Sequence, residues 1–253
     1  MQIVVQDLLV HYKEVGNGKT VILLHGWADR LETFQLLMQD LAQQYKVVAL
    51  DLPGFGKTQP PKGEWNLDDY SQFLSHFLNK TGNASGIHAV VGHSNGGALA
   101  IRAVSLGLIR PDKLVLLAAS GVRNTAKFKR AVLKLVAKTG KVATVWLPKS
   151  TRKKLQKKLY GTMGSDMLIS PELIETFKQT VRQDVQADAA SLSVPTLLVY
   201  GTDDSATPLP DVGQKLHALI KGSQLEVIPE ADHFVHQAAP EQVNKLILGF
   251  LNK

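Results

Sequence analysis

A five-residue motif, GHSNG at residues 92–96, constrains the fold of this chain more than any other stretch. It follows an apolar run, 87–91, and precedes an alanine-rich segment, 97–106, with the composition of a helix. Strand, then Gly-x-Ser-x-Gly, then helix is the context of a sharp turn that projects the serine hydroxyl from the edge of a sheet. Glycines two residues to either side remove the side chains that would collide in such a turn. The motif therefore predicts an exposed nucleophile at Ser94.

The rest of the chain alternates short apolar runs with segments of helical spacing. The runs predict strands at 2–5, 8–15, 20–24, 46–50, 87–91, 114–118, 195–200 and 224–228. Helices are expected at 33–44, 67–79, 97–106 and 240–251. Apolar strands that alternate with helices form a mostly parallel sheet covered by helices on both faces, and functional groups collect beyond the carboxyl ends of its strands. The fold class is therefore α/β, and 253 residues suffice for one such domain with an insertion.

Residues 122–192 interrupt this alternation with three segments of helical character. The first two place apolar side chains on one face and lysines or arginines on the other, and the third opens with a typical helix start, SPE at 170–172. Between residues 113 and 165 lie fourteen of the 29 Lys and Arg residues and no Asp or Glu. We expect a helical, strongly basic lid or cap at 122–192, inserted into a core domain formed by 1–121 and 193–253.

The basic surface of this insertion has two readings. It is either the solvated face of amphipathic lid helices whose apolar sides line the acyl pocket, or a surface that attracts something acidic. The acidic partner would be an anionic substrate, an acidic carrier protein or a membrane surface. Nucleic acid is not expected as a partner, because the basic runs lack a recognised binding module or an array of stacking aromatic side chains.

The composition and the N-terminus indicate the class and location of the protein. Cysteine is absent, which excludes disulfides and thiolate chemistry. Residues 1–7 lack the basic and long apolar regions of a secretory signal, and no apolar run approaches the length that spans a membrane. These features predict a cytoplasmic protein. No spacing typical of metal ligands or of a phosphate loop occurs, so neither a metal nor a cofactor is expected.

Five motifs, in this order, resemble those of the α/β-hydrolase superfamily, and of its serine esterase and lipase-like members with a helical lid. They are LLHGW at 23–27, DLPGFGKT at 51–58, GHSNGG at 92–97, GTDDSATP at 201–208 and DHFVHQAAPE at 232–241. Each motif is modest alone, but five in the correct order are specific, and they cover nearly the whole chain outside the insertion. The resemblance implies an α/β-hydrolase fold and the family's order of serine, then acid, then histidine.

The resemblance assigns a catalytic triad, and the chemistry of each residue type supports it. Ser94 is the nucleophile, and His233 is the base that removes its proton and later returns that proton to the leaving group. Asp204 fixes the tautomer of the imidazole and stabilises the imidazolium. The backbone N–H groups of Trp27 and Asn95 form the oxyanion hole, where the carbonyl oxygen becomes negative during the reaction.

Three points stay open between alternatives. Asp203 is the runner-up to Asp204 as the acid, and His236, one helical turn past His233, competes with it as the base. The side chain of Asn95 departs from the methionine or leucine that often occupies this position in related enzymes. It either contacts the acyl pocket or bonds to the backbone.

Two other histidines have expected structural roles. We expect His25 to shape the oxyanion loop rather than to transfer protons. His93 is expected to pack in the interior, because the geometry of the turn points it away from Ser94.

The chemistry that these residues predict is hydrolysis of a carboxylic ester through an acyl-enzyme, the reaction of a carboxylesterase. A serine at the turn argues against dehalogenase or epoxide hydrolase activity, for which related enzymes place aspartate there. The same triad serves C–C bond hydrolases, thioesterases, lactonases and acyltransferases. A non-catalytic module that binds a membrane or an acidic partner is disfavoured, because a complete triad would then be accidental.

Overall fold

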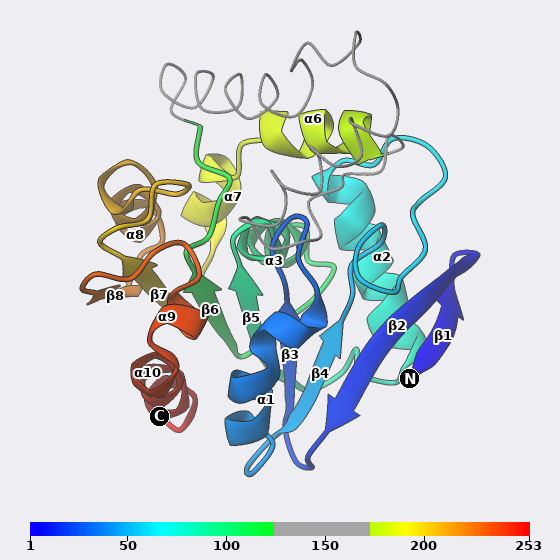
Figure 1. Cartoon of the computed structure of the whole chain (residues 1–253), viewed down its shortest axis with the longest axis horizontal. Helices are drawn as coiled ribbons and strands as arrows, with labels where there is room; N and C mark the ends of the chain where they lie inside the picture. The colour runs from blue at the N-terminus through cyan, green and yellow to red at the C-terminus, as the bar shows by residue number, and fades with distance from the viewer. Residues whose placement is uncertain (124–172) are drawn as a thin grey trace, which may run out of the picture. The chain divides into compact units, whose positions relative to one another are not determined.

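An eight-stranded sheet forms the centre of the molecule, and the computed structural model describes residues 1–123 and 173–253 (Figure 1). The strands are β1 (Gln2–Val5), β2 (Leu8–Val15), β3 (Thr20–Leu24), β4 (Lys46–Leu50), β5 (Ile87–His93), β6 (Lys113–Leu117), β7 (Thr196–Gly201) and β8 (Gln224–Ile228). Their order across the sheet is β1-β2-β4-β3-β5-β6-β7-β8. β2 is antiparallel to both of its neighbours, and all pairings from β4 to β8 are parallel. The predicted mostly parallel sheet is confirmed.

The middle strands are apolar along their whole length because helices cover both of their faces. Every residue of β3 and of β5 is buried. A sheet covered on one side only would instead alternate polar and apolar residues. The antiparallel edge starts with a two-residue turn at Gln6 and Asp7, whose φ values of 48° and 63° suit the right-handed twist of a hairpin.

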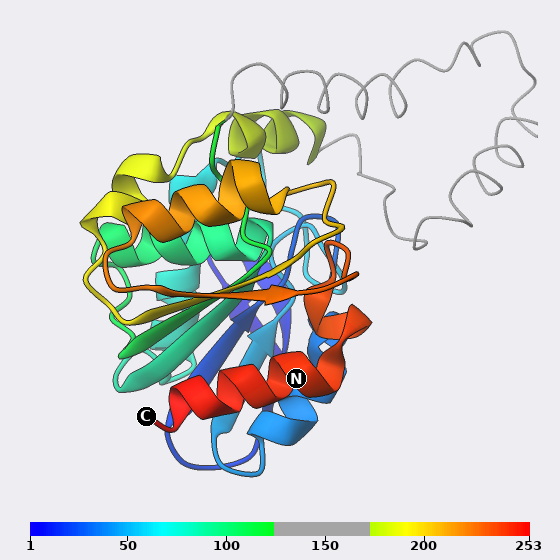
Figure 2. The same cartoon turned by 90° about the vertical axis from the view of Figure 1, so that its left-hand side faces the viewer.

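The helices form two layers around the sheet (Figure 2). One layer holds α1 (Gln35–Leu41), α9 (Val235–Ala238) and α10 (Pro240–Leu251), which pack together and against a large buried cluster of strand side chains. The other layer holds α2 (Leu67–Lys80), α3 (Asn95–Ser105), α7 (Gln186–Ser191) and α8 (Gln214–Leu219). Two single turns, η1 (Leu31–Phe34) and η3 (Leu209–Gly213), precede α1 and α8. The predicted coverage of both faces is therefore observed.

The last helical segment of the predicted cap belongs to the same unit as the sheet. The chain divides into two units, Met1–Val122 with Ser170–Lys253, and Arg123–Ile169. The first two helical segments that we predict in the cap lie outside the described residues. The third corresponds to α6 (Ile174–Arg182), which is tied to the first unit because the Trp65 backbone N–H donates to Thr176 Oγ1 at 3.1 Å.

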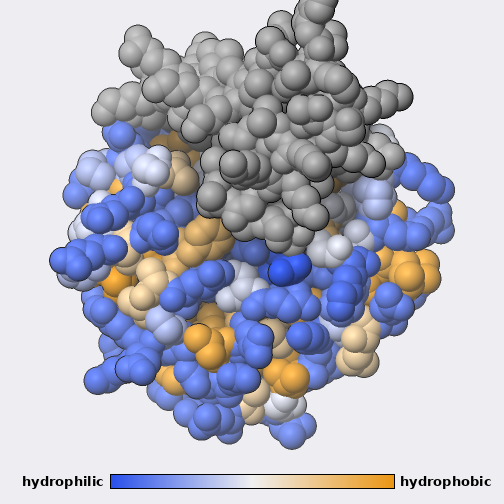
Figure 3. Space-filling model, viewed as in Figure 1, coloured by the Kyte–Doolittle hydropathy of each residue, from blue (hydrophilic) through white to orange (hydrophobic). Residues whose placement is uncertain are grey.

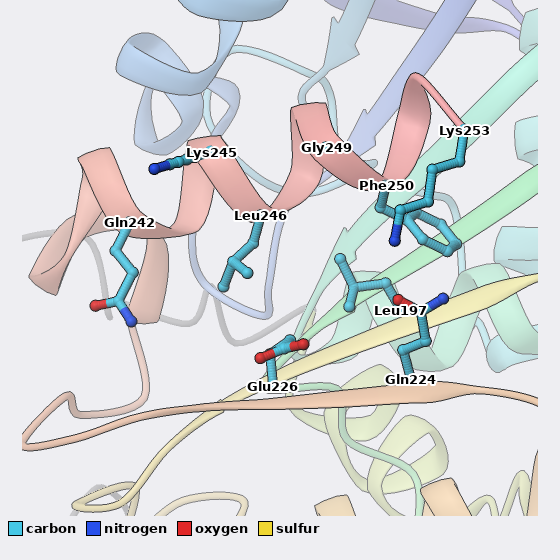
Figure 4. Close-up of a pocket in the computed structure, with 9 residues that line it drawn as sticks. All are labelled: Leu197, Gln224, Glu226, Gln242, Lys245, Leu246, Gly249, Phe250 and Lys253. Atoms are coloured by element: carbon cyan, nitrogen blue, oxygen red, sulfur yellow. The ribbon is translucent and has the colours of Figure 1, made fainter.

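The described surface is mainly hydrophilic in the view of Figure 3, and its apolar residues lie in small, separate areas. A groove of about 400 Å³ lies between α10 and β8, where Leu246 and Phe250 point toward Leu197 of β7 (Figure 4). Neither Ser94 nor His233 lines this groove. Within the two described ranges, no helix is long and apolar enough to cross a membrane.

Candidate active site

The turn at Ser94 joins β5 to α3 with almost no space between neighbouring backbones. Ser94 has φ 50° and ψ −115°, a conformation that residues with a side chain rarely adopt. A Cβ on Gly96 would lie 2.2 Å from the carbonyl oxygen of Leu24 in β3. A Cβ on Gly92 would lie 2.5 Å from the carbonyl oxygen of Gly96. The two glycines of the sequence motif thus have a direct steric cause.

Three side chains from separate loops form a hydrogen-bond chain beyond the carboxyl ends of β5, β7 and β8. His233 Nε2 lies 2.9 Å from Ser94 Oγ, and His233 Nδ1 lies 2.9 Å from Asp204 Oδ2. A carboxylate accepts, so Nδ1 carries the proton, and Nε2 is left to accept the hydrogen bond from the serine hydroxyl. An imidazole in this tautomer can take the serine proton. Residues distant in the sequence meet here because the carboxyl ends of parallel strands share one edge of the sheet.

Donors from the loop after β7 hold the buried carboxylate of Asp204. The backbone N–H groups of Ala206 and Thr207 each lie 2.8 Å from Oδ1, and Thr207 Oγ1 lies 2.7 Å from Oδ2. Burial by itself raises the pKa of Asp204, but the hydrogen bond and charge of His233, together with the donors of Thr207, outweigh it and lower the pKa. The carboxyl is therefore ionised across the neutral range and ready to orient the imidazole.

Asp203 lies in a different environment, although it precedes Asp204 directly. Its side chain is exposed, and its Oδ1 accepts a hydrogen bond from Thr202 Oγ1 at 2.9 Å. Its backbone N–H donates to the carbonyl oxygen of Ala231 at 3.0 Å. The structure brings Asp204 to His233, whereas the described contacts of Asp203 are with Thr202 and Ala231.

His236 lies in the interior beside η1 rather than at Ser94. Its Nε2 is 3.1 Å from Thr33 Oγ1, and its side chain is buried. Burial, with a smaller effect from the charge of His233, lowers the pKa of His236 to about 3. With so low a pKa, the His236 ring is neutral near pH 7, and its Nε2 is hydrogen-bonded to a group outside the triad. The geometry favours His233 over His236 as the partner of Ser94.

His25 shapes the loop that follows β3. Its Nε2 accepts a hydrogen bond from the Leu52 backbone N–H at 2.9 Å, and its Nδ1–H donates to the carbonyl oxygen of Gly26 at 2.7 Å. Burial lowers the pKa of His25, so the ring is a neutral link between two loops. This geometry agrees with the structural role expected for His25.

Two backbone N–H groups are available for an oxyanion. The loop after β3 passes directly against Ser94, since a Cβ on Gly26 would lie 3.2 Å from Ser94 Cβ. The next residue is Trp27, and within residues 1–123 and 173–253 its backbone N–H donates to no protein acceptor. The same holds in these ranges for Asn95, whose N–H also belongs to the positive end of α3. Both predicted donors are thus free to bind a ligand oxygen.

The side chains of Trp27 and Asn95 differ in their surroundings. The Trp27 ring packs between Phe55 and Phe177, with ring centroids 4.8 Å and 5.1 Å away. Asn95 is buried, and its side chain has no hydrogen-bond partner among the described residues. Of the two readings for Asn95, a bond to the backbone is therefore not seen.

Thr207 is a part of the site that sequence reasoning missed. Besides its contact with Asp204, its hydroxyl lies 3.0 Å from the carbonyl oxygen of Ala118 and 3.2 Å from His233 Nδ1. The signal was present, because Thr207 stands three residues after the acid and directly before Pro208 in the GTDDSATP motif. Among the described residues, no group of three or more His, Asp or Glu is arranged to hold a metal ion.

We predict that His236→Gln weakens the dependence of stability on pH. The folded pKa of His236 is about 3, whereas a histidine in an unfolded chain has a pKa near 6.5. Between these values the unfolded chain binds a proton that the folded chain does not, so this group lowers the free energy of unfolding by about 1.4 kcal/mol per pH unit as the pH falls. Urea unfolding at several pH values should show the gap between wild type and variant shrinking at that rate below about pH 6.5. A difference in free energy of unfolding that is independent of pH would contradict the lowered pKa of His236.

Comparisons with known proteins give the same architecture. A curated hydrolase of 2-hydroxy-6-oxo-6-(2′-aminophenyl)hexa-2,4-dienoic acid from Metapseudomonas resinovorans is 28% identical over 96% of this chain and 87% of that relative. A solved esterase from Thermogutta terrifontis is 21% identical and superposes with a TM-score of 0.80, covering 100% of this chain and 97% of the esterase. A meta-cleavage product hydrolase from Pseudomonas fluorescens is 24% identical, with a TM-score of 0.75 and coverages of 100% and 97%.

The model of one protein family matches most of the chain. It describes the alpha/beta hydrolase family and matches residues 21–246, from β3 into α10. The matched region contains Ser94, Asp204 and His233. The chain therefore belongs to the alpha/beta hydrolase family.

Proposed function

We propose that this protein is a serine hydrolase that cleaves carboxylic esters through an acyl-enzyme, with Ser94, His233 and Asp204 as its triad. The observation that carries the proposal is the hydrogen-bond chain with two distances of 2.9 Å, from Ser94 Oγ through His233 to Asp204. A serine hydroxyl is a weak nucleophile unless an adjacent base removes its proton, and His233 is such a base in this hydrogen-bond chain. Membership of a hydrolase family supports the reaction class but leaves the substrate open.

The first half of the reaction forms the acyl-enzyme. Ser94 Oγ attacks the ester carbonyl carbon while its proton passes to His233 Nε2, and the carbonyl oxygen becomes negative. The backbone N–H groups of Trp27 and Asn95 stabilise that oxygen. His233 then gives its proton to the departing alkoxide, which leaves as the alcohol, and the acyl group stays on Ser94.

The second half returns the enzyme to its starting state. A water molecule loses a proton to His233 Nε2 and attacks the acyl carbon, and the same two N–H groups stabilise the second oxyanion. The protonated His233 returns its proton to Ser94 Oγ as the carboxylic acid departs. Throughout, the ionised Asp204 accepts a hydrogen bond from His233 Nδ1–H and stabilises the imidazolium.

A C–C bond hydrolase is the second candidate, and one observation favours it. The M. resinovorans relative, 28% identical over nearly the whole chain, is named for the hydrolysis of a 2-hydroxy-6-oxo-dienoic acid. Ser94, activated by the same base, can attack the ketone of such a substrate. The C–C bond then breaks, and the departing carbon takes up the proton that His233 holds. The two candidates therefore differ in the bond that breaks and not in the triad.

The basic segment stays a proposal about binding. We propose that 122–192 is a cap past which a small-molecule acyl substrate reaches the triad. Its basic surface is either a solvated helix face or a surface that attracts an acidic partner. Most of this segment lies outside the described residues.

Ser94→Ala should abolish labelling by a fluorophosphonate probe. Fluorophosphonates bond covalently to activated serines, and removal of Oγ removes the reacting atom. Labelling is measured by in-gel fluorescence, with heat-denatured wild type as the control for nonspecific reaction. A Ser94→Ala variant that still labels at the wild-type rate would exclude Ser94 as the nucleophile.

Asp204→Asn should lower kcat by about 10³- to 10⁴-fold, because an amide leaves the imidazole in the wrong tautomer. The neighbouring change Asp203→Asn is the matched control and should leave kcat within about threefold of wild type, since Asp203 is exposed and paired with Thr202. Steady-state hydrolysis of p-nitrophenyl esters measures both. The opposite ranking of the two variants would transfer the role of the acid to Asp203.

A panel of esters and C–C substrates should distinguish the two candidate functions. We expect turnover of p-nitrophenyl and alkyl esters of graded acyl length, with kcat/KM at least about tenfold above that for a 2-hydroxy-6-oxo-dienoate. Ester cleavage is followed by release of p-nitrophenol and C–C cleavage by loss of the dienoate absorbance. Turnover of the dienoate alone would replace the ester proposal with the second candidate.

A further inference from the structure

His93, the residue before the nucleophile, is buried against the ring of His233. Its exposed fraction is 1%, and the ring centroids of His93 and His233 are 4.9 Å apart. The ring of His236 also contacts it, at a centroid distance of 4.8 Å. Gly26 makes the space for the ring, since a Cβ there would lie 3.0 Å from His93 Nδ1. The side chain is therefore held in one place from several directions.

One hydrogen bond joins His93 to the main chain of His233. His93 Nε2 lies 3.0 Å from the carbonyl oxygen of His233. A carbonyl oxygen only accepts, so Nε2 carries the proton and Nδ1 carries the lone pair. Nδ1 is buried, without a hydrogen-bond partner in the described part of the chain, and Asp29 Oδ2 is 4.0 Å away. The bond to the carbonyl thus selects the tautomer of His93.

This hydrogen bond connects two parts of the site that are far apart in the sequence. The loop after β8 is tied to the end of β7, because the Thr202 N–H donates to Ile228 O at 3.1 Å and the Asp203 N–H donates to Ala231 O at 3.0 Å. Those bonds place the loop relative to the strand of the acid. Among the described residues, the bond from His93 is the one that ties the main chain of this loop to β5, the strand of the nucleophile.

His93 can fulfil this role without disturbing proton transfer. Burial lowers the pKa of His93 well below its usual value, and the charges of His236 and His233 act in the same direction. The ring therefore stays neutral when His233 becomes an imidazolium. A neutral donor neither repels that cation nor competes for its proton.

We propose that His93 is a positioning residue whose Nε2–H holds the main chain of His233 at the place from which the His233 imidazole reaches both Ser94 and Asp204. The proposal rests on the proposed function, because it gives His93 the role of positioning His233, the base of that reaction. A positioning role depends on a hydrogen-bond donor at one position of the His93 side chain. A packing role would depend only on the volume of the ring.

Three substitutions at His93 separate the donor from the volume. His93→Gln places an amide N–H near the position of the imidazole Nε2, and His93→Asn carries the same amide one carbon shorter, near the position of Nδ1. His93→Leu fills similar space without a donor. We expect His93→Leu and His93→Asn to lower kcat by about 10- to 100-fold, since a misplaced base loses much of its effect, and His93→Gln to recover most of that loss. KM for a p-nitrophenyl ester should stay within about threefold of wild type in all three variants.

Thermal unfolding of each variant supplies the control for folding. A packing role would lower kcat in parallel with the unfolding temperature, and it would rank His93→Leu, with no buried polar group, at least equal to His93→Gln. Wild-type kcat in His93→Leu, or a loss in His93→Gln equal to that in His93→Leu at the same stability, would overturn the proposal.

A second measurement needs no variant to fold. Nitrogen-15 NMR of the histidine side chains in the wild-type protein should show His93 as the Nε2–H tautomer, without titration between pH 5 and pH 8. An Nδ1–H tautomer would overturn the proposal even if the variants were unfolded. If instead the wild type neither labels with a fluorophosphonate nor hydrolyses any substrate, the proposed function fails, while the tautomer still reports on the hydrogen bond to His233.

Discussion

The strained main chain of Ser94 is the constraint on which the surrounding geometry depends. A non-glycine residue in such a conformation costs about 1–3 kcal/mol and persists only where its surroundings enforce it. Here the Ser94 N–H donates to Leu117 O of β6 at 2.9 Å, and the Ser94 carbonyl accepts from the N–H groups of Gly97, Ala98 and Ser120. The turn is thus fastened on one side to α3 and on the other to β6 and the chain that follows it. Strand order and glycine contacts together force the hydroxyl outward.

The charge state of the site follows from burial. The ring of His93 packs on that of His233, and His25 and His236 lie near His93. A positive charge on any of these three rings would oppose formation of the His233 imidazolium. Burial lowers the pKa of His25, His93 and His236, so these three are neutral near pH 7. Asp204 is shifted toward its charged form because donors surround it. The protein therefore places one ionised acid beside His233, and the three other rings are neutral.

The fold and the meeting of the triad were predictable, because both follow from periodicity and from the strand-end rule for parallel sheets. The choice of Asp204 over the adjacent Asp203 came from the resemblance to the family and not from the chemistry of the residues. Asp203 and Asp204 have the same chemistry, and only the path of the loop after β7 turns one outward and the other to His233. The same reason hid Thr207 and the donor role of His93. Packing was predicted for His93, but a hydrogen bond to a main-chain carbonyl depends on a distance between loops that no spacing in the sequence encodes.

Because both candidate reactions use the same triad, we infer that the surrounding side chains decide between ester and C–C substrates. The ring of Trp27, the residue whose backbone N–H is a proposed oxyanion donor, packs on Phe177 of α6, the third helical segment of the predicted cap. A change in the position of α6 is therefore transmitted by ring packing to the oxyanion loop.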